Sequence, residues 1–474
     1  MRRTFGALLA VLFLPCISFA RSRVKIKKSG FDLKKAPNVL LVTFDTTRAD
    51  HLSCFGYVRR TSPTIDTLAA HGVLFMNAYT VEPLTGPSHI TMMTSLYPQQ
   101  HGATINGMHM STHPRPVLLA QILHHLGYKT AAFISAWTLK KSITGLGKGY
   151  NVYNENFTYH YKLVNSARRG DQMGRASRKW LRKHGHSHFF LWVHYFDPHH
   201  PYVLHSKFAN LPHIKNPRIF PVSAKADPHR AAEIRAYDSE IAFDDNDLAK
   251  TLKLLDDLGV RDNTLIVLVA DHGESLGEHG IWGHGYHIYQ PTVHVPMIYS
   301  FPKEIPQGER IKTNVSTVDI LPTVLSYIGL SFKVPGQEGY SLKPMIQHDV
   351  KDDVHAPPSF FEAYAEPALL PPKWMSMFWT WAETKRDPSM TGFVQGNLKV
   401  ISSGSNDALS VYHLSDNYSK TKLLANRNLK VANLSGYKEE LDNWFKETNR
   451  GLTPQVDLSK QDMEMLKSLG YANP

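Results

Sequence analysis

The stretch NTLIVLVADHGE (Asn263–Glu274) contains a continuous apolar run that ends in an acid and a histidine. Such a run is typical of a strand that is buried on both faces, as in a parallel sheet covered by helices. NVLLVTFD (Asn38–Asp45) repeats the pattern and also ends in an acid, and HFFLWVHYFD (His188–Asp197) is a further apolar run with polar residues at its end. These runs predict buried strands of an α/β fold.

Segments of helical periodicity alternate with apolar runs along most of the chain, at 63–75, 116–135, 240–259, 294–302 and 316–330. The alternation from Asn38 to Leu330 predicts a mostly parallel sheet with helices on both faces. We therefore expect a catalytic domain at 35–345. The C-terminal segment differs, because two strand-like runs at 397–416 precede an amphipathic helix at 437–450. This pattern predicts a small α+β domain at 375–474.

Composition excludes one class of partner. The chain has 474 residues and a formal net charge of +12, with 42% hydrophobic residues. A basic balance suits anionic partners, but the sequence has no Lys/Arg stripe interleaved with aromatic residues, so we expect no nucleic-acid binding. Cys16 and Cys54 are the only cysteines.

The N-terminus resembles an export signal. Arg2 and Arg3 precede a short apolar run, and Ser18 and Ala20 provide small residues for cleavage. A signal peptide at 1–20 predicts a periplasmic or secreted protein, by either the Sec or the twin-arginine route, and cleavage would leave no second cysteine for an internal disulfide. The alternative is an uncleaved anchor at residues 4–20, and membrane contact is expected only in that case.

Polar residues gather where the predicted strands end. Asp45 follows one strand, Asp271 and His272 follow another, and open α/β sheets bind ligands at this edge. Two carboxylates and an imidazole form a plausible divalent-metal site. Thr85 begins a predicted helix, where it is either a cap or a nucleophile whose hydroxyl completes the metal site. The acids and the histidine at the strand ends favour the interpretation of Thr85 as a nucleophile, because a helix cap needs no metal.

These segments resemble the sulfatase family of the alkaline-phosphatase superfamily. The resemblance rests on DTTRADHLSCFGY (45–57), TGPSHITMMTSLYP (85–98), GLGKGYNVY (145–153), HYFDPHHPY (194–202), DHGESLGEHGIWGHG (271–285), VDILPTVL (318–325) and LKSLGYA (466–472), which occur in the family's order. Family sulfatases oxidise a Cys or Ser to formylglycine, and Thr85 occupies that position. Threonine lacks the hydrogens needed to form the aldehyde, so no formylglycine is expected.

The resemblance also implies roles for other residues. His284 is expected to contact the anion or protonate the leaving group, and His199 is the second candidate acid; a structural role is the alternative for each. His89 stands where the family has arginine, and is expected to contact the anion. Arg48 is expected to orient Asp45 or the anion, with a surface ion pair as the alternative. A second metal at His51, His279 and His287 is less favoured than structural roles.

We therefore predict a metal-dependent hydrolase of sulfate or phosphate esters with a Thr85 nucleophile and a covalent intermediate. The ligands Asp45, Thr85, Asp271 and His272 favour Zn²⁺ or Mn²⁺, and Ca²⁺ stays open because family sulfatases commonly hold it. The expected substrate is a small anionic ester, or a sulfated or phosphorylated glycan or lipid. The alternatives are a phosphoethanolamine- or phosphoglycerol-type transferase and a non-catalytic anion-binding homologue.

Overall fold

The central sheet of the described chain has eight strands in the order β10-β2-β9-β6-β1-β5-β3-β4. The computed structural model describes residues 31–111, 116–157, 167–221, 225, 227–330, 333–349, 357–364, 389–403, 408–414, 422–425 and 434–448. The strands are β1 (Asn38–Phe44), β2 (Val73–Tyr79), β3 (Lys129–Phe133), β4 (Val152–Asn154), β5 (Phe189–Tyr195), β6 (Thr264–Ala270), β9 (His294–Ser300) and β10 (Glu309–Ser316).

The three longest apolar runs lie side by side at the centre of this sheet. Strand β1 pairs in parallel with β5 on one side and with β6 on the other. All residues of these strands are buried, as expected for a sheet covered on both faces. Their carboxyl ends therefore meet at one edge of the sheet.

The predicted mostly parallel sheet is confirmed, with β9 as the exception. Strand β9 pairs antiparallel with both β2 and β6. The segment 271–293 between β6 and β9 contains short elements: β7 (Ser275–Leu276), a 3-10 turn at Glu278–Gly280, β8 (Trp282–Gly283) and α8 (Gln290–Val293). No long helix returns the chain to the opposite edge, so β9 starts where β6 ended and runs back beside it.

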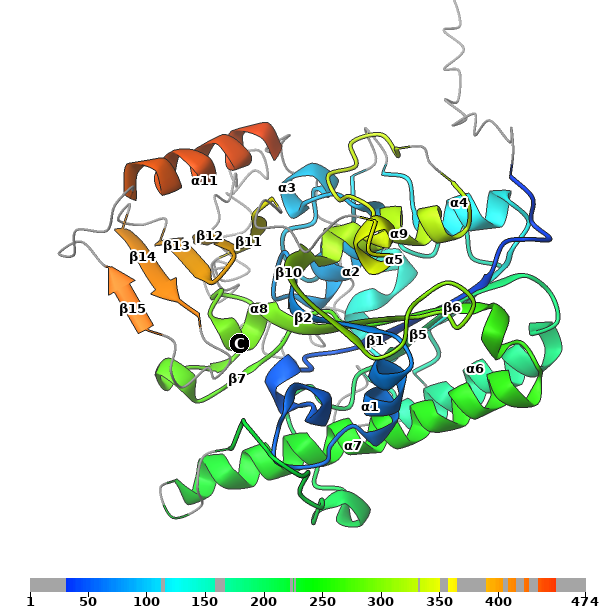
Figure 1. The fold of residues 1–474 in the computed structure, drawn as a ribbon, viewed down its shortest axis with the longest axis horizontal. Helices are drawn as coiled ribbons and strands as arrows, with labels where there is room; N and C mark the ends of the chain where they lie inside the picture. The colour runs from blue at the N-terminus through cyan, green and yellow to red at the C-terminus, as the bar shows by residue number, and fades with distance from the viewer. Residues whose placement is uncertain are drawn as a thin grey trace, which may run out of the picture. The chain divides into compact units, whose positions relative to one another are not determined.

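Helices cover both faces of the sheet (Figure 1). One face carries α1 (Pro63–Ala70), α6 (Gly170–His184) and α7 (Pro228–Asp257), and these share a hydrophobic core with β1, β5 and β6. Helix α7 begins with Pro228, and the Asp227 side chain accepts the Arg230 N–H at 3.0 Å as an N-cap. The other face carries α2 (Thr85–Thr94), α4 (Leu119–His125) and α9 (Ile320–Tyr327). The described chain also contains the short helices α3 (Pro98–His101), α5 (Lys141–Thr144) and α10 (Lys343–Ile346).

A second, antiparallel sheet follows, in the order β11-β12-β13-β14-β15. Its strands are β11 (Ser359–Ala363), β12 (Met390–Gln395), β13 (Leu398–Ser403), β14 (Ala408–His413) and β15 (Lys422–Ala425). Helix α11 (Leu434–Thr448) packs on it through Leu441. Phe361 of β11 shares a core with Tyr79 of β2, which joins the two sheets. Strand β11 lies before residue 375, where the sequence predicted this domain to begin.

The predicted signal peptide at 1–20, the alternative anchor at 4–20 and the LKSLGYA segment lie outside the described residues. Within the described part of the chain, no helix is both long and apolar enough to span a bilayer.

Candidate active site

Two acids and a histidine meet where β1 and β6 end. Phe44 and Ala270, the last residues of these parallel strands, are register partners, so Asp45 and Asp271 follow at neighbouring positions. Potential ligand atoms of Asp45, Asp271 and His272 all lie within 4.8 Å of one another, and the three side chains are fully buried. The expected grouping at the sheet edge is therefore present.

Thr85 reaches this group from α2. It is the first residue of the helix, Leu84 is the cap position, and no side chain makes a capping hydrogen bond there. The Thr85 hydroxyl lies instead 3.4 Å from His272 Nε2. The geometry thus gives the hydroxyl a contact with the polar group rather than with the free N–H groups of the helix.

Lone pairs converge between Asp271 and His272. The Nδ1–H of His272 donates to the Gly273 carbonyl at 2.9 Å, which leaves a lone pair on Nε2. Asp271 Oδ1 accepts the backbone N–H groups of Thr46 and His272 at 3.1 and 2.8 Å. Its Oδ2 lies 3.6 Å from His272 Nε2 and accepts no hydrogen bond within the described chain. A cation at this point would satisfy atoms that otherwise repel.

The electrostatics of the group lead to the same conclusion. Burial, and then the charge of Asp45, raise the pKa of Asp271 well above its ordinary value. Burial, and then His284, lower the pKa of His272. Two buried carboxylates are costly without a compensating positive charge, so the donor set fits a divalent cation.

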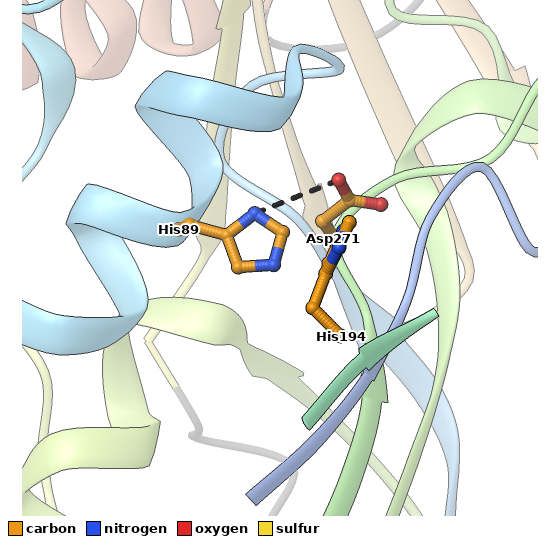
Figure 2. Close-up of side chains that lie close together, drawn as sticks. All are labelled: His89, His194 and Asp271. Carbon is orange, nitrogen blue, oxygen red and sulfur yellow. Dashed lines mark ion pairs between the residues drawn. The ribbon is translucent and has the colours of Figure 1, made fainter. Parts of the chain in front are cut away.

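His89 and His194 lie beside Asp271, one member of this group (Figure 2). His194 accepts the Ser135 backbone N–H at Nδ1 (3.3 Å), so its Nε2–H donates to Asp45 Oδ2 at 3.2 Å. His89 Nδ1–H donates to the Thr85 carbonyl at 2.8 Å and lies 3.6 Å from Asp271 Oδ2. Its Nε2 accepts the Thr43 hydroxyl at 3.1 Å. These rings hold Asp45 and Thr85 in position.

The His89 ring, which was expected to contact the anion, has partners within the protein at both nitrogens. Burial, and then His194, lower the pKa of this ring. It therefore has no free donor for a substrate. For the same reason the close grouping of His89, His194 and Asp271 does not form a second metal site, because every ring nitrogen already has a partner.

His199 and His284 come together beside the metal-binding group. Their Nε2 atoms are 3.2 Å apart, and the His284 ring lies 4.3 Å from the His272 ring. The Nδ1–H of His284 donates to the Pro83 carbonyl at 3.1 Å, and that of His199 donates to the His200 carbonyl at 2.6 Å. A hydrogen bond between the Nε2 atoms would need a third proton, which would give the pair one positive charge. Burial lowers the pKa of His284 to about 4.

Arg48 does not contact Asp45. Its guanidinium forms a two-point ion pair with Asp50 at 2.7 and 2.8 Å, and a further ion pair with Glu278 at 3.0 Å. The side chain is almost fully buried, so this is a buried ion pair rather than a surface one. His51 likewise pairs with Asp238 at 2.8 Å, and the His279 side chain is outside the described set.

A model of the Sulfatase family matches residues 37–330, which contain every site residue described above. The chain belongs to the sulfatase family. It is 25% identical over 360 residues to the uncharacterized sulfatase YidJ of Escherichia coli, an alignment that covers 62% of this chain and 68% of YidJ. It is 23% identical over 411 residues to an N-acetylglucosamine-6-O-sulfatase of Bacteroides thetaiotaomicron, covering 67% and 72%.

Solved structures show the same fold. A phosphonate monoester hydrolase from Silicibacter pomeroyi superposes with a TM-score of 0.64 at 18% identity, covering 87% of this chain and 94% of that one. Membership of the sulfatase family makes this chain an ester hydrolase of the sulfatase type. Sulfatase-family enzymes use a metal, and the group at Asp45, Asp271 and His272 is a candidate for it.

One residue of this sulfatase-family site was not anticipated from the sequence. Asn106 Oδ1 accepts the Gly86 backbone N–H at 2.7 Å, directly after Thr85. Its Nδ2 is buried and has no hydrogen-bond partner within the described chain. An unsatisfied amide donor beside the candidate nucleophile suits an anion. No sequence signal marks Asn106, because it lies in a loop with no recognisable motif around it.

Proposed function

We propose that Thr85 is the nucleophile of this hydrolase. The observation that carries the proposal is the contact of its hydroxyl with His272 at the start of α2, where it makes no capping bond. The Thr85 hydroxyl releases its proton to solvent, and its oxygen attacks the sulfur or phosphorus of the ester. The bond from that atom to the alcohol oxygen breaks, and water later cleaves the threonyl ester to release the inorganic anion.

The residues proposed to hold the metal are Asp45, Asp271, His272 and Thr85. When bound, the ion would lower the pKa of the Thr85 hydroxyl and neutralise charge on the ester oxygens. Two carboxylates with one imidazole favour Zn²⁺ or Mn²⁺, with Ca²⁺ as the alternative. His194 supports this role for Asp45, because its Nε2–H orients the carboxylate through the 3.2 Å hydrogen bond. We propose that no formylglycine forms.

The His199–His284 pair is the proposed general acid. Both Nδ1–H groups are directed to carbonyl oxygens, so the mobile proton lies between the Nε2 atoms. An anionic ester bound nearby favours the charged pair. The low pKa of His284 makes that charged form a ready donor to the departing alcohol.

Two features are proposed to stabilise the developing negative charge. The N-terminus of α2, a helix of 10 residues, directs the positive end of its dipole toward the ester. The Asn106 amide supplies a fixed donor beside Gly86.

Replacing Asn106 by aspartate tests the second feature. The change keeps an oxygen for the Gly86 N–H but puts a carboxylate where the anion would bind. We expect kcat/KM to fall by about 10²–10³-fold, the effect of losing one such donor. Asn151→Asp is the matched control, because Asn151 Oδ1 also accepts a backbone N–H, from Thr130 at 2.9 Å, in an exposed position. Wild-type kcat/KM in a folded Asn106→Asp protein would contradict the role.

The substrate class requires a direct screen. One relative is named for a 6-O-sulfated amino sugar and one structural neighbour for phosphonate monoesters, so both sulfate and phosphorus esters belong in the panel. We expect turnover of at least one of aryl sulfate, N-acetylglucosamine-6-sulfate, phosphate monoester, phosphodiester and phosphonate monoester, measured with added Zn²⁺, Mn²⁺ or Ca²⁺. Turnover that requires an added alcohol would indicate the transferase instead. No turnover of any ester by folded, metal-loaded protein would contradict the proposal.

A further inference from the structure

A second polar group lies where the loop before Thr85 meets the second sheet. Glu82 belongs to that loop, Gln99 to α3 and Glu362 to β11. The Glu362 backbone N–H donates to the Val81 carbonyl at 2.8 Å, which aligns the loop with β11. Gln99 Nε2 donates a hydrogen bond to Glu362 Oε2. Segments far apart in the sequence therefore bring two carboxylates and an amide together.

All side-chain oxygen atoms of this group except Glu362 Oε2 lack hydrogen-bond partners within the described chain. Glu82 and Glu362 are 0% exposed and Gln99 is 3% exposed. Both carboxylate oxygens of Glu82, Oε1 of Glu362 and Oε1 of Gln99 have no hydrogen-bond partner among the residues that the structure describes. The buried lysine of the same sheet, Lys399, is directed elsewhere, because its Nζ donates to Gln290 at 3.1 Å.

Such a group is costly as it stands. A buried carboxylate without a partner is strongly destabilising, and a second carboxylate nearby increases the cost. Burial, and then the charge of Glu362, raise the pKa of Glu82, and burial raises that of Glu362. A single shared proton would remove one charge but leave most of the unpartnered oxygens unsatisfied, including the uncharged Gln99 oxygen. One divalent cation would balance both charges and supply a partner for carboxylate oxygens that have none.

We propose that Glu82, Gln99 and Glu362 bind a Ca²⁺ ion. The donors are oxygens alone, which Ca²⁺ prefers, and it accepts glutamate as a one- or two-point ligand in an irregular shell. The lack of a histidine distinguishes this group from the one at Asp45 and His272, where an imidazole favours Zn²⁺ or Mn²⁺. The ion would fasten the loop that carries Thr85 to the second sheet.

The experiment compares calcium content in variants of the full chain. Wild type, Glu82→Gln, Glu362→Gln and Asp271→Asn are equilibrated with Ca²⁺, desalted and analysed for metals. We expect about one Ca²⁺ per chain in wild type, held by this oxygen-rich group. The ion should be lost from Glu82→Gln and Glu362→Gln but kept by Asp271→Asn, because Asp271 belongs to the other group. Ca²⁺ in hundredfold excess over Kd should also raise the unfolding midpoint of Asp271→Asn by about 3–6 °C.

Glu338→Gln is the matched control, because Glu338 also accepts a glutamine amide, from Gln100, but is exposed. It should retain the calcium. Wild-type calcium content in folded Glu82→Gln would overturn the proposal, and so would a calcium-free wild type. If neither glutamate variant folds, the calcium content of Asp271→Asn tests the proposal. Fewer than about one Ca²⁺ per chain in that variant would overturn the proposed calcium site. Failure of the catalytic proposal would give a different result: Asp271→Asn would keep the metal assigned to Asp45, Asp271 and His272.

Discussion

Replacing Thr85 by alanine is expected to lower kcat/KM on the best substrate by at least about 10⁴-fold, with the fold intact. A factor of 10⁴ corresponds to about 5.5 kcal/mol of lost transition-state stabilisation. A lost helix cap costs only about 1 kcal/mol of stability. Because the Thr85 hydroxyl makes no capping bond, we expect the free energy of unfolding to change by less than that. Steady-state kinetics and thermal unfolding of the same sample measure both quantities.

Two companion measurements separate nucleophilic attack from a positional role. Thr85→Ser keeps the hydroxyl and should retain measurable activity, while Thr85→Ala should not. A slow substrate quenched in acid should leave sulfate or phosphate on the peptide that contains Thr85, which mass spectrometry detects as a fixed mass increase. Wild-type turnover by Thr85→Ala would show that the residue is not the nucleophile and would remove the covalent mechanism with it.

The parts of this site that could be predicted from the sequence share one property. Asp45, Asp271 and His272 each follow a long apolar run, and parallel strands bring such ends to one edge. Strand periodicity therefore located them, although Thr46 and Asp271, which share a hydrogen bond, are separated by 225 positions. The same reasoning predicted the central sheet but not the direction of β9, which depends on the short connection at 271–293.

Other features depend on contacts that no local pattern encodes. The tautomers of His89 and His194 are set by a hydroxyl and a backbone N–H from different elements, which the resemblance at the family's arginine position does not reveal. Arg48 was expected to orient Asp45 or the anion, or to form a surface ion pair; its guanidinium forms a buried ion pair with Asp50, only two positions away. Asn106 is identified only from the structure, in which its buried Nδ2 has no hydrogen-bond partner within the described chain.

Asp271→Asn is expected to abolish binding of the catalytic metal, and activity with it. The amide oxygen can still accept the N–H groups of Thr46 and His272, so the local backbone should keep its hydrogen bonds. The negative charge that compensates a cation is lost, and the amide is a poor substitute for a carboxylate. We expect the content of Zn²⁺ or Mn²⁺ to fall from about one ion per chain to near zero, and kcat/KM to fall by at least about 10³-fold.

Thermal unfolding supplies a readout that does not depend on turnover. Removal of the metal from wild type leaves Asp45 and Asp271 as a buried like-charge pair, whereas Asp271→Asn removes one of those charges. In chelator the variant should therefore be at least as stable as wild type. Adding metal at a hundredfold excess over Kd should stabilise wild type by about 2.7 kcal/mol and leave the variant unchanged. Asp257→Asn, at the exposed end of α7, is the control for the same chemical change and should respond like wild type. Equal metal-induced stabilisation of wild type and Asp271→Asn would show that the ion binds elsewhere, and the ligand assignment at the strand ends would then be wrong.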